Sequence, residues 1–202
     1  MRYVIGLTGA IACGKSTISR ILSGLGARII DADRIGHAVL RKGQGAYEPV
    51  VKAFGRQILD AHGEIDRKIL GPLVFSSKEK LQELNSLTHP HIINNIVKQI
   101  SANDGIMVLD AALLFETRLD AFCDEIWYVW AKKELQLERV MQRDALSKEE
   151  ALRRIESQKG DPAKKKKARL IDNSGSPREL EREVKRLYRQ VENICAEKRR
   201  KS

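Results

Sequence analysis

The chain has 202 residues, of which 42% are hydrophobic and 32% charged, and its net charge is +10 at pH 7. Such a composition suits a soluble globular protein large enough to bury a core without disulfides or metals. The three cysteines are far apart and form no CxxC pair, which argues against a disulfide scaffold. No apolar stretch reaches the roughly 18 residues of a membrane span. The apolar run after Met1 is too short for a secretion signal, so we expect a cytoplasmic protein.

The positive charge favours anionic partners such as nucleotides, phosphorylated metabolites or nucleic acid. Much of the excess lies in two runs, Lys164–Lys167 and Lys198–Lys201. The first run is interpreted either as a solvated face or as an attractor of polyanionic substrates.

The first elements predict a nucleotide-binding unit. Residues 3–8 are rich in Val, Ile and Leu and predict a buried parallel strand. A glycine loop follows, and then a helix from about residue 15 to 25, which Gly26 ends. A second strand is expected at 27–30, with Asp31 and Asp33 at its carboxyl end.

The next region, residues 34–100, has helical periodicity and no strong strand pattern. Glycines, together with Pro72, divide it into short helices. The helix with Leu81 is expected to break at Pro90, where another begins. We interpret the region as a helical subdomain inserted between strands.

Strands and helices alternate again in the remainder of the chain. Strands are expected at 106–109, 126–129 and 169–171, and one polar helical segment at about 133–157. The last helix begins at Pro177 with Ser176 as its cap. This order predicts an α/β fold, with a five-stranded parallel sheet covered on both faces in three α/β/α layers.

The segment Gly9–Ser16 matches the phosphate-binding pattern G-x-x-x-x-G-K-[ST] between a strand and a helix. Backbone N–H groups of such a loop and the helix N-terminus attract phosphates. Lys15 is expected on the β- and γ-phosphates, Ser16 on Mg²⁺ and Thr17 on the α-phosphate. The loop residues that we expect to bind ATP are Ile11, Ala12, Cys13, Gly14, Lys15, Ser16 and Thr17.

Two questions about the loop stay open at this point. Cys13 is either a small filler or a thiol activated by the helix N-terminus. The loop alone indicates only nucleoside triphosphate binding. The absence of an N-K-x-D guanine motif and the length of the chain favour a compact kinase.

Carboxylates after the second strand supply a candidate base. Asp33 lies at the sheet edge that holds ligands in open α/β folds, where it can accept a proton from a substrate hydroxyl. Asp31 serves equally well as a helix cap. Asp110, at the end of the third strand, either holds a Mg²⁺-bound water or caps the following turn.

Together with the phosphate loop, several further segments resemble the dephospho-CoA kinase family over nearly the whole chain. The similar segments are Leu7–Thr17, Asp31–Asp33 with Ile35, Asp66–Phe75, His89–Ile92, Leu113–Glu116, Gln142–Asp144, Glu150–Ile155 and Ile171–Gly175. Two kinds of departure occur: Ala10 and Ala12 stand where the family favours glycine, and Ala112 stands where it has proline.

The resemblance implies transfer of the ATP γ-phosphate to the ribose 3′-hydroxyl of dephospho-CoA, with Mg²⁺ as cofactor. It implies Asp33 as the proton acceptor, Lys15 and Arg143 as further catalytic residues, and Arg139 and Asn173 on ATP. The residues that it implies for the acceptor site are Thr8, Asp33, Arg67, His89, Leu114 and Glu116. The implied domains are a P-loop kinase core (1–35, 101–132 and 160–202), an acceptor-binding subdomain (36–100) and a lid (133–159).

Several of these residues have structural alternatives. Arg139 and Arg143 lie four residues apart and would form a solvated helix face. His89 is compatible with a structural hydrogen-bonding role, and Arg67 with a surface pair to Asp66 or Glu64.

Alternative functions are another small-molecule kinase acting on nucleosides or nucleoside monophosphates, a nucleic-acid-binding ATPase, and an inactive regulatory domain. The low aromatic content and the lack of a groove-reading motif argue against nucleic acid. Intact Lys15, Ser16 and Asp33 argue against inactivity. We expect ATP and dephospho-CoA as partners, no membrane, and a monomer or weak homo-oligomer.

Overall fold

The computed structural model describes residues 1–157 and 166–200, so Lys164, Lys165 and Lys201 of the two basic runs lie outside the described residues. Within this part of the chain, no helix has the length and apolarity needed to cross a membrane. The chain forms two compact units: unit 1 is Met1–Ile30 with Asn103–Ser202, and unit 2 is Asp31–Ala102.

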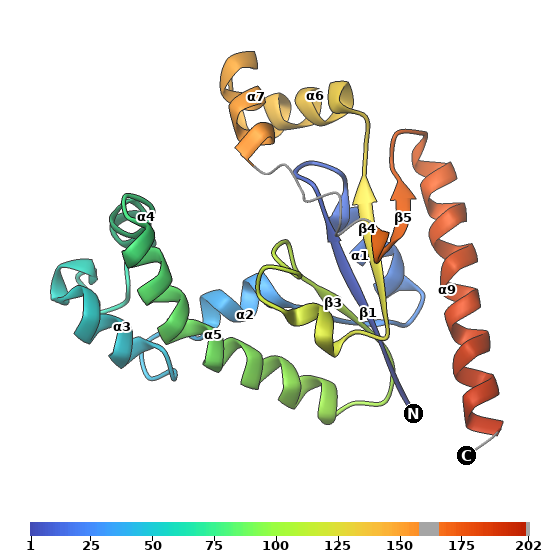
Figure 1. Ribbon diagram of the computed structural model, residues 1–202, viewed down its shortest axis with the longest axis horizontal. Coiled ribbons are helices and arrows are strands. Elements are labelled where there is room, and N and C mark those ends of the chain that lie inside the picture. Colours follow the sequence, from blue (N-terminus) through green and yellow to red (C-terminus); the bar gives the residue numbers. More distant parts are fainter. Residues whose placement is uncertain (158–165, 201–202) are drawn as a thin grey trace. The chain divides into compact units, whose positions relative to one another are not determined.

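A five-stranded parallel sheet organises unit 1 (Figure 1). Its order is β2-β3-β1-β4-β5, so β1 lies at the centre. The five strands are β1 (Arg2–Gly9), β2 (Arg28–Asp31), β3 (Gly105–Asp110), β4 (Glu125–Trp130) and β5 (Arg169–Asp172). Every predicted strand is present within about one residue of its expected bounds, and the predicted α/β fold is confirmed.

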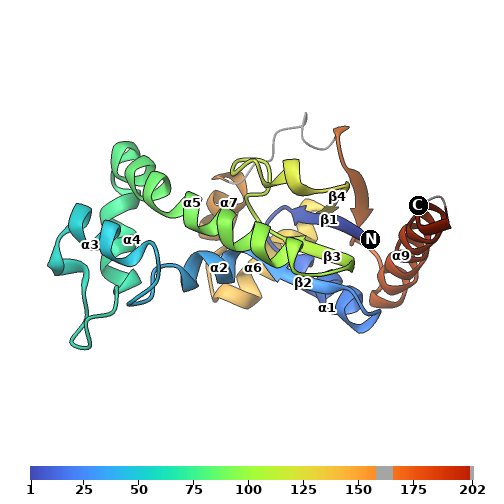
Figure 2. The same ribbon diagram turned by 90° about the horizontal axis from the view of Figure 1, so that it is seen from below.

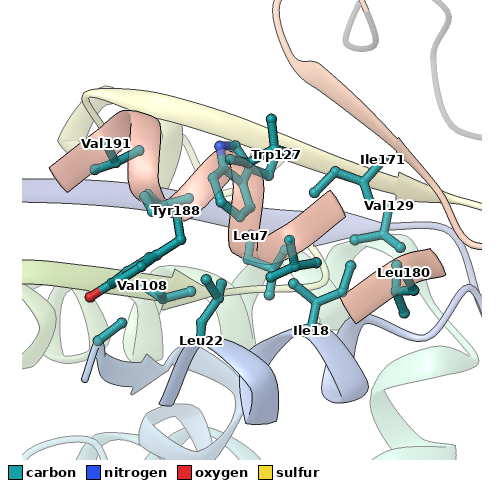
Figure 3. Close-up of a cluster of buried hydrophobic side chains, with 14 of the residues drawn as sticks. Leu7, Ile18, Leu22, Val108, Trp127, Val129, Ile171, Leu180, Tyr188 and Val191 are labelled. Carbon is teal, nitrogen blue, oxygen red and sulfur yellow. The ribbon is translucent and has the colours of Figure 1, made fainter. Parts of the chain in front are cut away.

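Two helices, α1 (Lys15–Gly24) and α9 (Pro177–Arg200), pack against each other and share one hydrophobic core with the sheet. Figure 3 shows side chains of both helices meeting Leu7 and Trp127 of the central strands. Gly26 ends α1 as predicted: φ is 96°, its N–H donates to the carbonyl of Ser23, and that of Ala27 donates to Leu22. These bonds fix where the phosphate-loop helix stops and β2 begins.

The predicted start of α9 is also confirmed. The Ser176 Oγ accepts a hydrogen bond from the Glu179 N–H at 3.3 Å, and the Glu179 carboxylate accepts one from the Ser176 N–H at 2.7 Å. This reciprocal capping box satisfies two N–H groups at the start of the helix.

Unit 2 is helical, as the sequence predicts, and has its own small core around Val50, Ile58 and Leu70. Its elements are α2 (Ala32–Ala38), α3 (Tyr47–Phe54), the 3-10 helix η1 (Arg56–Ile58), α4 (Arg67–Phe75) and α5 (Lys78–Ser101). Helices α2, α3 and α4 all pack against α5 (Figure 2).

Two predicted helix breaks in unit 2 are wrong. Pro72 lies inside α4, and Pro90 lies inside the 24-residue α5. A proline removes one backbone hydrogen bond from a helix. In α5 this cost is offset by apolar side chains on both sides of Pro90, from Leu81 to the fully buried Ile96.

The polar segment after β4 is two helices rather than the single predicted one. Helix α6 (Lys133–Asp144) ends at Ala145, whose φ is 52°, and α7 (Lys148–Ser157) follows. Ser147 caps α7 in a second reciprocal capping box with Glu150. Val140, Ala151 and Ile155 form a small core between the two helices, against which Ile11 and Ala12 of the phosphate loop pack. The α6–α7 hairpin is therefore anchored on the loop itself.

Candidate active site

The phosphate loop joins β1 to α1 and is held by backbone hydrogen bonds. The Cys13 N–H donates to the Ala10 carbonyl, and the Ala10 N–H donates to the Val129 carbonyl, both at 3.3 Å. A Cβ on Gly9 would lie 2.5 Å from that Val129 oxygen, so only glycine fits there. Gly14 is the N-cap of α1 and offers no side chain to its first N–H groups. Such N–H groups, with the helix dipole, make an anion-binding end.

A cavity of about 360 Å³ lies over this helix end, entirely within unit 1. Its lining combines backbone of the loop with positively charged side chains, as a polyphosphate requires. The lining residues are Gly9, Ala10, Ile11, Ala12, Cys13, Gly14, Lys15, Ser16, Ala112, Arg143 and Arg154.

Lys15 is held by a carboxylate at the end of β3. Its Nζ pairs with Oδ1 of Asp110, and the Ser19 Oγ donates to Oδ2 of the same residue. Asp110 is only 8% exposed, so its two oxygens depend on these donors. Both carboxylate oxygens of Asp110 are therefore engaged, one by Lys15 and the other by Ser19. Ser19 lies one helical turn after Lys15 and was not among the predicted site residues.

Arg139 and Asn173, which were predicted to bind ATP, both contact the loop backbone. The Asn173 Nδ2 donates to the Cys13 carbonyl at 2.8 Å. Arg139 donates to the carbonyls of Ala12 at 3.4 Å and Asn173 at 3.1 Å. Ala12, where the family favours glycine, has φ 56°, a conformation that costs a non-glycine residue about 1–2 kcal/mol. These bonds help to hold that conformation from outside the cavity.

Gly14→Ala should damage this arrangement far more than the same change at Gly26. Both glycines have positive φ, but a Cβ on Gly14 would lie 2.1 Å from the Asn173 Nδ2, whereas Gly26 has open space. Gly26→Ala should cost only about 1–2 kcal/mol of unfolding free energy and spare ATP binding. Gly14→Ala should cost more and abolish ATP binding. Urea unfolding and ATP titration of both variants test this, and equal losses would contradict it.

Two arginines of the α6–α7 hairpin reach the cavity. Arg143 donates to Asp144 through Nε at 2.8 Å and Nη2 at 2.9 Å, and the Nη1 of Arg154 lies 2.9 Å from Oδ2 of the same carboxylate. The hydrogen bond from Arg143 holds the pKa of Asp144 below its usual value, and that bond raises the pKa of Arg143. Arg154 lies in the segment that resembles the family but was not among the predicted site residues, because a continuous helix gives no reason for it to return beside Arg143. The S-x-x-E pattern at Ser147 was the available signal for the turn.

Three predicted acceptor residues lie in unit 1. Thr8 is 3% exposed, and its hydroxyl donates to the Ala112 carbonyl at 3.2 Å. Leu114 is fully buried, and Glu116 is exposed. Burial raises the pKa of Tyr128, with smaller contributions from Cys13 and Glu116.

Cys13 of the phosphate loop is 1% exposed within the main core. This burial favours the filler interpretation over the reactive thiol, which needs access.

The other predicted acceptor residues lie on three helices of unit 2. Asp31 is the N-cap of α2 and accepts a hydrogen bond from the Arg34 N–H at 2.8 Å. Asp33 is the second residue of α2 and is exposed. Arg67 is exposed at the start of α4, and His89 is half-buried in α5. Asp31 therefore has the cap role that its position allowed.

Comparisons with known proteins agree with one another. The model of the family described as Dephospho-CoA kinase matches residues 3–179. A dephospho-CoA kinase of Carboxydothermus hydrogenoformans is 50% identical over 178 residues, covering 86% of each chain. One of Bacillus licheniformis is 41% identical and covers 96% of this chain and 99% of the relative.

Solved structures give the same result. The dephospho-CoA kinase of Campylobacter jejuni is 34% identical with a TM-score of 0.71, covering 95% of this chain and 98% of that one. A shikimate kinase of Acinetobacter baumannii, at 16% identity and a TM-score of 0.53, shares the fold alone. The chain belongs to the dephospho-CoA kinase family.

Proposed function

We propose that this protein transfers the γ-phosphate of ATP to the ribose 3′-hydroxyl of dephospho-CoA and so produces coenzyme A. The observation that carries the proposal is the intact phosphate-loop cavity, with Lys15 and two arginines at its lining, in a member of this family. Cytoplasmic location and a monomeric or weakly associated state are part of the same proposal.

The donor side of the reaction is assigned to unit 1. The loop N–H groups and Thr17 bind the phosphates, and Lys15 neutralises charge as the γ-phosphoryl group leaves. The pairing of Lys15 with Asp110 supports this role, because it fixes a long side chain in one direction. Arg143 stabilises the same developing charge. Arg139 and Asn173 hold the loop in shape through hydrogen bonds to the carbonyls of Ala12 and Cys13.

The residues at the loop fit a Mg²⁺ ion bound mainly through phosphate oxygens. Ser16 is exposed in the first turn of α1 and offers the hard oxygen ligand that Mg²⁺ prefers. When bound, the ion would neutralise charge on the β- and γ-phosphates. Asp110 is a second candidate, but both of its oxygens already accept hydrogen bonds from Lys15 and Ser19. No group of three potential metal ligands occurs among the described residues.

The acceptor side is assigned by family resemblance. Asp33 accepts the proton of the 3′-hydroxyl, and residues 36–100 form the acceptor-binding subdomain with Arg67 and His89. Thr8, Leu114 and Glu116 complete that site. Residues 133–159 act as a lid, of which 158 and 159 lie outside the described residues. The exposure of Asp33, two residues after the helix cap Asp31, supports the assignment of the base.

An acceptor competition tests the function. Purified protein with ATP and Mg²⁺ is offered dephospho-CoA, nucleosides or nucleoside monophosphates in parallel, and ADP release and the phosphorylated products are measured. We expect turnover of dephospho-CoA at least about 100-fold above the other acceptors, because a polar acceptor site rejects ligands that leave its groups unpaired. Turnover of a nucleoside instead would support the alternative kinase.

A further inference from the structure

One carboxylate in the α6–α7 hairpin binds both arginines that line the phosphate cavity. Asp144 ends α6 and accepts two hydrogen bonds from Arg143 of its own helix. It also pairs with Arg154 of α7. Of these three residues, the mechanism proposed above uses only Arg143 and gives Asp144 and Arg154 no role.

The pairing leaves donors on both guanidinium groups. An arginine carries five N–H donors in a planar fork. Arg143 uses two of its five on Asp144, and Arg154 contacts Asp144 through one nitrogen, Nη1. Each group therefore keeps an edge that can donate to a phosphate while Asp144 holds the opposite edge.

The local fold forces the two arginines together. The left-handed Ala145 ends α6, the Ser147–Glu150 capping box starts α7, and the small core around Val140 fixes the turn. Ile11 and Ala12 of the loop pack against this core. The arginine pair therefore lies at the lining of the phosphate-loop cavity, with each side chain about half exposed.

We propose that Arg154 is a second phosphate-binding residue and that Asp144 is the positioning residue that holds Arg143 and Arg154 for the nucleotide phosphates. The proposal rests on the proposed function only for the identity of the nucleotide. Long arginine side chains lose rotamer freedom on binding, and a carboxylate that fixes them beforehand lowers this cost.

The direction in which Asp144→Asn changes the affinity for Mg-ATP tests the role of Asp144. Asp144→Asn removes a negative charge next to the phosphate site, so simple attraction predicts tighter ATP binding. Positioning predicts the opposite: the dissociation constant of Mg-ATP should rise about 5- to 10-fold. Arg154→Ala should raise it about 10-fold, and Arg154→Lys nearly as much, because a lysine loses the fork. Titration calorimetry without acceptor measures these constants.

Adenosine, which has no phosphate, supplies the ligand control, and its affinity should change less than twofold in every variant. Arg153→Ala is the matched protein control, because Arg153 is exposed on the same helix and does not line the cavity. It should leave Mg-ATP affinity unchanged. Thermal unfolding of each variant checks that the hairpin remains folded.

A variant that lacks both arginines tests whether Asp144 acts on Mg-ATP binding through them. In a protein carrying both Arg143→Ala and Arg154→Ala, Asp144→Asn should not weaken Mg-ATP binding, because no arginine is left to position. Unchanged or tighter binding in Asp144→Asn alone, or equal weakening in both backgrounds, would overturn the positioning role. An Arg154→Ala variant that binds Mg-ATP like Arg153→Ala would overturn the role of Arg154. Because these readouts need no acceptor, they stand even if dephospho-CoA is not phosphorylated.

Discussion

Lys15→Ala is expected to lower kcat/KM for ATP by about 10²–10³-fold, the effect of removing one donor that stabilises developing charge. The lysine carries a full charge to the β- and γ-phosphates, and Asp110 fixes its direction. Affinity for ATP should fall as well. Steady-state kinetics with saturating dephospho-CoA, together with ATP titration, measure the two losses.

The same change should also destabilise the fold. Asp110 is 8% exposed and would keep the hydrogen bond from the Ser19 hydroxyl but lose its ion pair. A buried charge that loses its partner costs about 3–5 kcal/mol. Urea unfolding should show a loss of this order in Lys15→Ala.

A second substitution separates stability from catalysis. The double variant Lys15→Ala/Asp110→Asn removes the stranded charge, so most of the lost unfolding free energy should return while turnover stays low. Recovery of turnover together with stability would show that Lys15 acts on folding rather than on phosphates. Unfolding by urea and turnover are measured on the same preparations.

Local signals explain what could be predicted from the sequence. The Gly9–Ser16 pattern, Gly26 and Ser176 each act within one turn of the chain, and all three lie where they were expected. The strands were found because buried parallel strands are short, continuous apolar runs. The alternation of strands and helices along the chain was then enough to predict an α/β fold.

Tertiary context explains the errors. Pro72 and Pro90 carry a strong local signal for a break, but packing across α4 and α5 overrides it. Arg154 was missed because the turn at Ala145 was missed, although the Ser147 capping box was visible. The bonds from Asn173 and Arg139 to the loop join segments more than 100 residues apart. No periodicity or spacing encodes such contacts.

Asp33→Asn is expected to lower kcat by about 10²–10⁴-fold, the range for loss of a general base. The amide keeps the shape of the side chain but cannot take the proton of the acceptor hydroxyl. Because Asp33 contributes no group to the phosphate-loop cavity, the dissociation constant of ATP should stay within about threefold. Single-turnover kinetics and ATP titration separate the two quantities.

Asp31→Asn is the matched control, because it makes the same chemical change two residues earlier at the start of the same helix. Asp31 is the N-cap of α2, and asparagine caps about as well as aspartate. Both stability and turnover should therefore remain close to the unsubstituted protein. If Asp33→Asn kept turnover within tenfold, or if Asp31→Asn lost as much, Asp33 would not be the base. Both variants remove one negative charge at the start of α2. The difference between their turnover rates therefore measures the contribution of proton transfer to Asp33.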